Sequence, residues 1–403
     1  MDTNASWGPP VVAGGRMGVL VSSTGGAGHL LPLLPLARAL ERAGHAVRIA
    51  CPASFTGFAR RYGLPVSGFG EPDPDELAAV WATVPLDDPD AANRVVIGQV
   101  YGRLDATAAL PALDALVAAW RPDLVLRDTA EFGAALVAER HRLRCVRVGC
   151  SLAALDGIFA AAAADGLAAP RAAAGLPPNP EGGALLAGGY LTQFPQSMED
   201  PAVPAADAWR FRDVPPAPSP LPDWWAGGEE PLVYVTFGTV AASQGLFPGP
   251  YASVIDSLAD LPVRVLLTVG EAADPAALGP LPPRVHVERF VPQRRVLAAA
   301  TAMVTHGGSG SVLGALAAGL PLVVLPLFAD QPHNAARVAA LGAGLNVTGG
   351  PAAAGQVGAA VAAVLDDPAY RAGAQRVAAE MAALPTPDQT ATRLAALATG
   401  SPA

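Results

Sequence analysis

Two histidines stand at glycine-rich junctions between an apolar run and a helical segment, where side chains can meet a ligand. The first is His29, the last residue of Thr24–His29, which contains three glycines and is followed by Pro32. Glycine lets the backbone pass close to a ligand, and imidazole exchanges protons near neutral pH. Since a helix start disfavours a cation, we expect His29 to be neutral and to act as a general base. A tight turn with an incidental histidine is the alternative.

A carboxylate is the natural partner for this base. Asp128 ends the largely apolar run Pro122–Asp128 in the same half of the chain. From there it could accept the Nδ1 proton of His29, which would orient the ring and stabilise the imidazolium as it forms. Position alone slightly favours another role, in which Asp128 caps a helix over Glu131–Arg142.

The second junction, Thr305–Ser311, has the sequence THGGSGS and is the strongest motif in the chain. Backbone N–H groups at the start of the following helix would hold a diphosphate, and the serine hydroxyls and the imidazole would add donors. The chain contains no lysine, so its 26 cationic side chains are all arginine. P-loop, pyridoxal and Schiff-base chemistry are therefore excluded. The expected diphosphate ligands are His306, Gly308, Ser309, Gly310 and Ser311.

Three shorter motifs also follow predicted strands. An acid beside an amide, Asp330-Gln331, would read several sugar hydroxyls, although Asp330 could instead cap the next helix. The stretch Phe290–Gln293 would stack its aromatic ring on a nucleobase and bond the base edge, with core packing of Phe290 as an equal alternative. A glycine turn after another strand would contact the phosphates. The residues in these motifs are Gly238, Thr239, Phe290, Val291, Gln293, Asp330 and Gln331.

The elements that must position these residues are strands alternating with helices, a pattern that predicts parallel, doubly wound sheets. The Pro-rich stretch 214–222 interrupts the pattern, which then restarts. Since 403 residues suit two domains, we predict an α/β chain with two Rossmann-like lobes that face each other across a cleft. The predicted boundaries are 1–215, 223–385, and a terminal helix in 386–403 that could pack back on the first lobe. Helices are predicted over His29–Ala43, Glu131–Arg142, Gln293–Ala300 and Gly310–Ala318. Strands are predicted over Met17–Ser22, Ala46–Ala50, Leu124–Leu126, Cys145–Val148, Leu232–Thr236, Val263–Val269, Val285–Glu288, Ala302–Thr305 and Pro321–Leu325.

Composition narrows the class of protein. Hydrophobic residues make up 51% of the chain and charged residues 15%, so a packed core is assured. The net charge of −9 argues against a nucleic-acid partner. Three scattered cysteines, no signal peptide and no apolar run of membrane-spanning length predict a soluble cytoplasmic protein without disulfides. The acidic stretches Asp73–Asp75 and Asp87–Asp90 are typical of solvated loops, so no metal site is expected.

Together these motifs resemble the two-lobed GT-B nucleotide-sugar glycosyltransferases, in the bacterial natural-product branch that acts on macrolide or aromatic aglycones. The stretch Gly28–Pro32 resembles the family's N-terminal GHxxP signature. Three blocks, Phe290–Gln293, His306–Ser311 and Asp330-Gln331, resemble its donor-binding signature in order and spacing. The resemblance covers most of 225–345 and about the first 45 residues.

This resemblance implies an inverting hexosyl transfer without a metal or other cofactor. His29 would be the catalytic base and Asp128 its partner, and the residues named above would hold a TDP- or UDP-sugar. Plant members usually have tryptophan where Phe290 stands, which leaves thymidine donors at least as open as uridine donors. The acceptor would be a small apolar molecule, aromatic or polyketide-like, without nucleic acid or membrane as partners. A homodimer is left open.

Three other functions stay open. An NAD(P)-dependent oxidoreductase would use Gly308 and Gly310 as a partial GxG with Asp330 about 20 residues on, although Leu313 replaces the third glycine. A sugar-nucleotide epimerase of the same fold would need acids in the cleft and no acceptor. A catalytically silent partner subunit would not need the histidine–aspartate pair.

Overall fold

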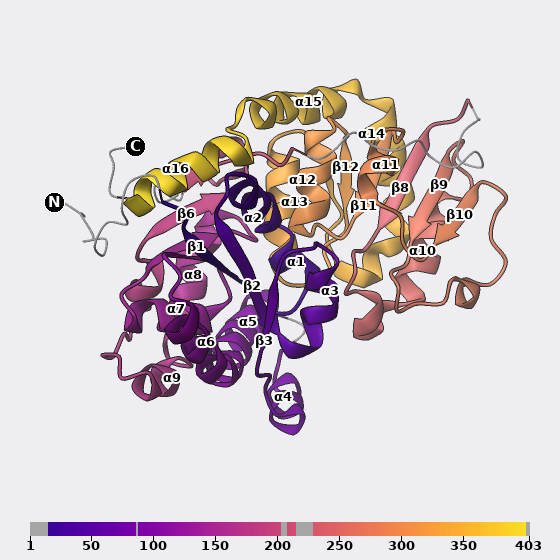
Figure 1. Cartoon of the computed structure of the whole chain (residues 1–403). Helices are drawn as coiled ribbons and strands as arrows, with labels where there is room; N and C mark the ends of the chain where they lie inside the picture. Colours follow the sequence, from indigo (N-terminus) through magenta and orange to yellow (C-terminus); the bar gives the residue numbers. More distant parts are fainter. Residues whose placement is uncertain (1–14, 86–87, 203–207, 215–228, 400–403) are drawn as a thin grey trace. The chain divides into compact units, whose positions relative to one another are not determined.

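The chain forms two compact units, each built on one parallel sheet (Figure 1). A computed structural model describes residues 15–85, 88–202, 208–214 and 229–399. The two parallel α/β sheets confirm the predicted fold class. Unit 1 comprises 1–193, 201–214 and 385–403, and unit 2 comprises 194–200 and 215–384.

The sheet of unit 1 has seven parallel strands in the order β3-β2-β1-β4-β5-β6-β7. Because β1 pairs with β2 on one side and with β4 on the other, the strand order reverses between β1 and β4. Open parallel sheets bind ligands outside the carboxyl ends of the strands at such a reversal. The strands are β1 (Gly18–Ser22), β2 (Ala46–Pro52), β3 (Val66–Phe69), β4 (Leu124–Asp128), β5 (Arg144–Val148), β6 (Gly189–Thr192) and β7 (Ala208–Arg210).

Helices cover both faces of this sheet. One buried cluster joins the sheet to α2 and α16, and another joins it to α6, α7 and α8. The helices of unit 1 are α1 (Ala27–Leu30), α2 (Leu34–Arg42), α3 (Thr56–Arg60), α4 (Pro74–Trp81), α5 (Pro89–Val95), α6 (Ala106–Trp120), α7 (Phe132–Arg140), α8 (Ala153–Ala164), α9 (Ala168–Ala173) and α16 (Pro387–Thr399), with short 3₁₀ turns η1 (Ala53–Phe55) and η3 (Gly183–Leu186).

The expected single helix over His29–Ala43 is instead two helices, α1 and α2, separated by a turn. Pro32 and Pro35 have no backbone N–H, so a continuous helical hydrogen-bond ladder cannot run through them. As a consequence His29 lies in a helix of only four residues directly after β1.

A π-helix, η2 (Val96–Asp105), connects α5 to α6. Such wide turns are frequent at functional sites. Two glycines let it approach α8 closely: a Cβ atom on Gly98 would lie 2.7 Å from the carbonyl oxygen of Ala162, and one on Gly102 3.2 Å from that of Ala163. The close packing against α8 fixes the position of the residues that η2 carries.

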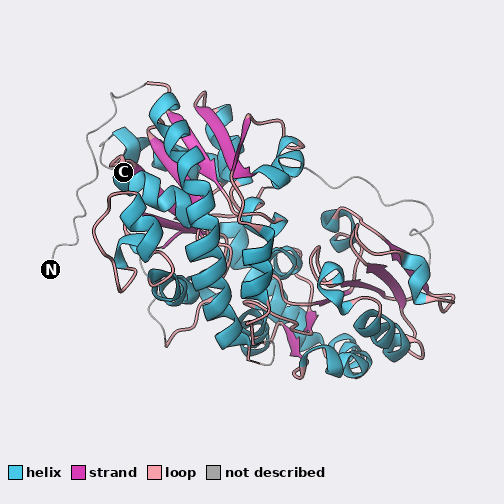
Figure 2. Ribbon diagram, turned by 90° about the horizontal axis from the view of Figure 1, so that it is seen from below, coloured by secondary structure: helices cyan, strands magenta, loops and turns pink. Residues whose placement is uncertain are grey.

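The sheet of unit 2 has six parallel strands in the order β10-β9-β8-β11-β12-β13, and its order reverses between β8 and β11. Thr236 at the end of β8 pairs with Thr305 at the end of β11, so the residues that follow these strands lie close together. Figure 2 shows helices packed around the strands. The strands are β8 (Leu232–Thr236), β9 (Arg264–Thr268), β10 (Val285–Glu288), β11 (Ala302–Thr305), β12 (Leu322–Val324) and β13 (Gly344–Asn346). The helices are α10 (Gly249–Leu258), α11 (Gln293–Leu297), α12 (Ser309–Ala317), α13 (Gln331–Ala340), α14 (Val357–Asp366) and α15 (Pro368–Ala383), with shorter turns η4 (Gln196–Met198), η5 (Ala242–Leu246), η6 (Pro275–Leu278) and η7 (Gly350–Gln356).

The boundaries of the units differ from the expected lobe 1–215 at one segment. Phe194–Asp200 belongs to unit 2. The guanidinium of Arg337 in α13 donates to the carbonyl oxygens of Met198 and Ser197, at 3.0 Å each, and so ties this segment to the second sheet's helices.

The last helix, α16, packs against α2 in unit 1 (Figure 1). Leu394 is buried in the same cluster as the α2 leucines, and Arg42 forms an ion pair with Asp388 at 2.6 Å. The last described helix therefore belongs to the same unit as the first strand. The predicted linker 214–222 lies outside the described residues from position 215 onward.

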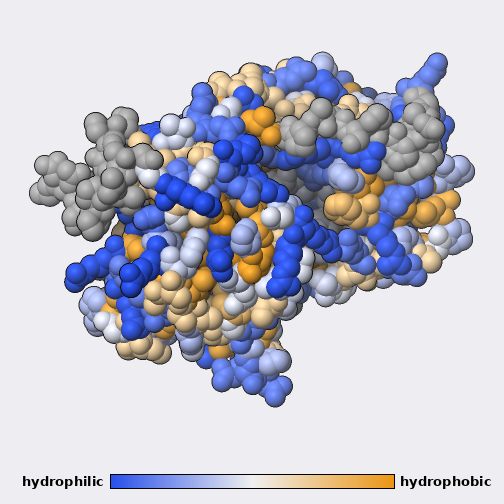
Figure 3. All heavy atoms as spheres, viewed as in Figure 1, coloured by the Kyte–Doolittle hydropathy of each residue, from blue (hydrophilic) through white to orange (hydrophobic). Residues whose placement is uncertain are grey.

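Two acidic stretches expected as solvated loops contain helix caps. The carboxylate of Asp73 accepts from the first N–H groups of α4, and that of Asp88 accepts from those of α5, while Asp87 lies outside the described residues. On the face drawn in Figure 3 the α4 region is hydrophilic. Among the described residues no helix is both long and apolar enough to cross a bilayer.

Candidate functional site

His29 and Asp128 meet at the carboxyl edge of the unit 1 sheet, at the reversal between β1 and β4. Nδ1 of His29 lies 3.2 Å from Oδ1 of Asp128, the last residue of β4. The His29 side chain is 22% exposed and the Asp128 side chain 1%. The pair therefore combines a buried carboxylate with an imidazole that reaches the surface, as a base and its orienting partner require.

Backbone donors fix the Asp128 carboxylate. Its Oδ2 accepts from the N–H of Thr24 and its Oδ1 from the N–H of Ala130, at 2.8 Å each. Helix α7 is capped by Glu131, whose carboxylate accepts from the N–H of Ala134. Asp128 is therefore not the cap of α7, and its remaining hydrogen-bonding capacity faces His29.

The other ring nitrogen of His29 faces a tyrosine that no sequence motif indicates. The hydroxyl oxygen of Tyr101, in η2, lies 3.5 Å from Nε2 of His29. The two rings meet edge to face, with centroids 5.7 Å apart. The imidazole therefore lies between a carboxylate at Nδ1 and a phenol at Nε2. Because the carboxylate accepts the Nδ1 proton, Nε2 is the nitrogen that can accept a proton from a ligand.

The pKa of His29 is raised well above its ordinary value of 6.5. Burial lowers this pKa, but negative charge on Tyr101, Asp128 and Cys150 together raises it by more. Burial also raises the pKa of the Tyr101 phenol, and the hydrogen bond between the ring and Asp128 adds to the upward shift of the His29 pKa. The raised pKa opposes the expectation that a helix start keeps His29 neutral: α1 has only four residues, and a buried carboxylate contacts the ring.

Replacing Asp128 with asparagine should lower the pKa of His29. The substitution removes the charge that favours the imidazolium, whereas the burial that disfavours it stays. An NMR titration of the imidazole signals should therefore show a lower midpoint than in the wild type. His45, whose ring accepts a hydrogen bond from the N–H of Met17 in the same unit and whose pKa is lowered by burial, should keep its midpoint and serves as the internal reference. An unchanged or higher midpoint for His29 would show that Asp128 is not its charge partner.

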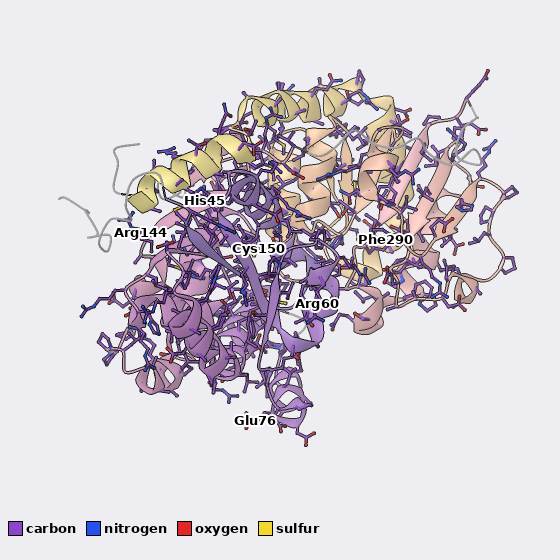
Figure 4. The ribbon with its side chains drawn as sticks, viewed as in Figure 1. His45, Arg60, Glu76, Arg144, Cys150 and Phe290 are labelled. Carbon is purple, nitrogen blue, oxygen red and sulfur yellow. The ribbon has the colours of Figure 1, made fainter. Side chains whose placement is uncertain are left out.

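Two further titratable side chains lie at this edge and are not predicted by any motif. The pKa of Asp105 is raised to about 6 by burial first and by Glu71 second, while His29 lowers it. Cys150, labelled in Figure 4, follows β5, and its Sγ lies 3.2 Å from Oγ1 of Thr129. Both come from segments whose proximity to α1 depends on the order of the strands.

In unit 2, His306 follows β11 at the reversal between β8 and β11. A Cβ atom on Gly238 would lie 2.7 Å from Nε2 of His306, and one on Gly308 would collide with the same atom. Gly238 and Gly307 have φ angles of 77° and 94°, which glycine adopts without strain. Glycine is therefore needed for the ring to fit between the two turns, and Thr239 is exposed in the first of them.

Burial lowers the pKa of His306 to about 4, and a hydrogen bond to the backbone of Thr236 opposes this shift. Nδ1 of the ring lies 3.2 Å from Oγ1 of Thr305. The imidazole is therefore neutral near pH 7. An anion at this place would meet backbone dipoles and a neutral ring, and its charge would favour protonation of that ring.

Helix α12 begins directly after this turn, and its N-cap, Gly308, provides no side-chain cap. The N–H groups of a helix start are an anion-binding arrangement. Beside them, the Ser309 hydroxyl donates to Oδ2 of Asp330 at 3.0 Å, and the Asn334 amide donates to the same oxygen at 3.1 Å. Asp330 makes no side-chain cap to α13, so the structure places its carboxylate at the start of α12. Asn334 is a member of this group that sequence motifs do not reveal.

The buried side chain of Gln331 hydrogen-bonds to the loop that precedes α13. Its Oε1 accepts from the N–H groups of Leu327 and Phe328, at 2.9 and 3.0 Å. Ala329 in this loop has a φ of 57°, a left-handed conformation that is unfavourable for a residue with a Cβ atom. The amide oxygen therefore stabilises the loop that carries Asp330, and contact of Gln331 with a sugar stays a prediction.

The remaining predicted residues follow β10, and one of them contacts α12. Phe290, labelled in Figure 4, is 59% exposed after β10, so it does not pack in the core. Gln293 begins α11, where its Nε2 donates to the carbonyl oxygen of Gly310 at 3.3 Å and its Oε1 accepts from the hydroxyl of Ser311 at 3.4 Å. Val291 is partly exposed between them. An exposed aromatic ring, a helix start and an acid thus follow β10, β11 and β12 of one sheet, in which β11 and β12 are neighbours and β10 is an edge strand.

The chain is similar in sequence to a protein family and to proteins of known function. Residues 252–397 match the family described as "Erythromycin biosynthesis protein CIII-like, C-terminal domain". L-demethylnoviosyl transferase from Streptomyces niveus is 34% identical over 391 residues, which cover 94% of this chain and 98% of that protein. The elloramycin glycosyltransferase ElmGT from Streptomyces olivaceus is 34% identical over 395 residues, 94% of this chain and 97% of that protein.

A solved structure has a similar fold over almost the whole length of this chain. The glycosyltransferase SsfS6 from Streptomyces sp. SF2575, complexed with thymidine diphosphate, matches with a TM-score of 0.75 at 28% identity. The match covers 94% of this chain and 99% of that one.

Proposed function

Because this chain belongs to the family of glycosyltransferases from antibiotic pathways, we propose that it moves a sugar from a TDP-sugar to a small apolar acceptor by an inverting, metal-independent displacement. The observation that carries this proposal is the His29–Asp128 pair at 3.2 Å at the carboxyl edge of its sheet. Relatives that are transferases argue against the oxidoreductase and epimerase alternatives. The thymidine diphosphate bound to SsfS6 supports thymidine over uridine.

In the proposed reaction unit 1 activates the acceptor. Nε2 of His29 takes the proton of the acceptor hydroxyl as its oxygen attacks the anomeric carbon. Asp128 stabilises the imidazolium that forms, and its two backbone donors keep it oriented. Since the pKa of His29 is raised, the fraction of active, neutral base increases with pH through that pKa.

Unit 2 holds the donor in this proposal. The N–H groups that begin α12 bind the diphosphate and stabilise the charge that develops as it leaves. Phe290 is exposed enough to stack on the base, and Asp330, tied to Ser309, links the phosphate site to the sugar. A displacement in which the acceptor attacks opposite the leaving diphosphate inverts the anomeric carbon, and backbone dipoles supply stabilisation that a metal would otherwise give.

The test is a panel of TDP- and UDP-hexoses with aromatic and macrolide aglycones, assayed in EDTA by mass spectrometry. We expect a glycoside from a TDP-sugar, with inverted anomeric configuration by NMR. Retained configuration would exclude the single displacement. Turnover that is lost in EDTA and restored by Mg²⁺ would exclude metal independence. Conversion of the donor alone to a new nucleotide sugar would instead favour an epimerase.

Replacing Tyr101 with phenylalanine should raise the KM for the acceptor while the affinity for TDP stays unchanged. The phenol contacts the nitrogen that receives the acceptor proton, and a neutral hydrogen bond contributes about 0.5–1.5 kcal/mol, or up to about tenfold. Steady-state kinetics and calorimetry with TDP measure the two effects. Tyr62→Phe, in the same unit, is the control. An unchanged acceptor KM in Tyr101→Phe would remove the phenol from acceptor binding.

A further inference from the structure

A cysteine joins the His29–Asp128 pair and has no part in the proposed reaction. Cys150 lies two residues beyond the end of β5. One ring nitrogen of His29, one carboxylate oxygen of Asp128 and the Sγ of Cys150 all lie within 4.8 Å of one another. Within the described ranges of the chain, no other group of three or more such side chains lies as close together. The three residues come from α1, β4 and the turn after β5, so only the folded sheet assembles them.

The atoms in this cluster suit a particular class of ion. Nitrogen, oxygen and sulfur together are ligands for Zn²⁺ and similar borderline cations, whereas Mg²⁺ and Ca²⁺ prefer oxygen alone. Bonds of about 2.0–2.3 Å place the ligand atoms of a tetrahedral Zn²⁺ roughly 3.3–3.8 Å apart. Since the atoms lie within 4.8 Å of one another, they must move together by up to about 1–1.5 Å, which rotation of the partly exposed His29 and Cys150 side chains can supply.

Asp128 can take a metal without losing its backbone donors. A carboxylate accepts at about four lone-pair positions, and three are used here, by the N–H groups of Thr24 and Ala130 and by His29. The carboxyl group of Asp105 interacts electrostatically with the same histidine. A cation at this edge therefore meets acidic neighbours.

We propose that His29, Asp128 and Cys150 form a three-ligand site for a borderline divalent cation such as Zn²⁺, with water at the fourth position. The thiol proton goes to solvent when the ion binds, and one imidazole nitrogen becomes a metal ligand. The consequence for activity rests on the proposed function: a metal-bound His29 cannot act as the base. The site is therefore inhibitory.

Spectroscopy tests the site independently of catalysis. The full chain without a histidine tag is freed of metal with EDTA, exchanged into buffer and titrated with Co²⁺ at constant pH. We expect a thiolate-to-cobalt band in the near ultraviolet, which added Zn²⁺ removes. Cys150→Ala should lose this band and bind Zn²⁺ at least about 100-fold more weakly, since a direct ligand matters more than an outer-shell partner. Cys51→Ala removes a thiol that is buried elsewhere in unit 1 and should keep both properties.

Kinetics tests the consequence. Zn²⁺ should inhibit transfer by the wild type, EDTA should reverse the inhibition, and Cys150→Ala should turn over normally in EDTA yet resist Zn²⁺. A wild type without a thiolate band, or equal inhibition of the wild type and Cys150→Ala, would overturn the proposal. A protein that shows the band but transfers no sugar would support the metal site and count against the proposed function alone.

Discussion

Replacing His29 with alanine should lower kcat by about 10²–10⁴-fold, the usual contribution of a general base, while TDP binding is retained. The loss is expected in kcat because proton removal belongs to the transition state, and the proposed TDP site lies in unit 2. Product formation at saturating substrates measures the first effect, and calorimetry with TDP measures the second. Because the pKa of His29 is raised, the wild-type rate should fall as pH decreases through that pKa, and the alanine variant should lose this dependence.

The matched control is His141→Ala. His141 contacts Asp114 at 2.7 Å and is 28% exposed, so it is also a histidine–aspartate pair on the surface of unit 1. It lies at the end of α7, which leads to the start of β5 and so to the opposite edge of the sheet. We therefore expect His141→Ala to turn over at the wild-type rate. Equal losses in both variants would indicate general destabilisation, and full activity in His29→Ala would remove His29 from the mechanism.

Replacing His306 with alanine should weaken TDP binding by about 10–150-fold, because a hydrogen bond to a charged group contributes about 1.5–3 kcal/mol. The ring fits between Gly238 and Gly308, so its removal also loosens the turn that starts α12. The effect should appear in the dissociation constant of TDP and in the KM for the donor. At saturating donor, kcat should change much less than in His29→Ala.

His286→Ala is the control for this second variant. His286 lies in β10 of the same unit, is 49% exposed and contacts Glu288 at 2.9 Å, so its loss should leave TDP affinity unchanged. The melting temperature of both variants without ligand separates binding from stability. An unaltered dissociation constant in His306→Ala would show that the diphosphate is held without this ring.

Strands buried on both faces are predictable because they read as apolar runs of fixed length. β8 and β11 have the expected bounds, and β9 and β12 are one residue shorter at each end. The edge strand β10 also has the expected bounds, although it is partly exposed. β3, with the sequence VSGF, and β13, with GLN, are short and partly polar. These edge strands form because each pairs with a neighbouring strand. Their own sequences do not show that this strand is present, so they are not predicted.

The residues of the candidate site likewise fall into those that the sequence predicts and those that it does not. The glycine-rich turns beside His29 and His306 can be predicted, because the glycines and the histidine of each turn are neighbours in the sequence. Tyr101, Cys150 and Asn334 carry no such signal, since each reaches its site from a separate element. The direction of the His29 pKa could not be predicted either, because it depends on a carboxylate 99 positions away in the chain and on the length of α1.

The place of α16 in unit 1 has a consequence for chimeric enzymes. An exchange of donor specificity between relatives by joining everything after the linker would also import a foreign final helix. That helix would have to cover α2 with its own counterparts of Ala391, Leu394 and Ala398 and replace the Arg42–Asp388 pair. A graft that replaces only 215–384 and keeps the native tail should therefore give better-folded hybrids than a simple two-part fusion.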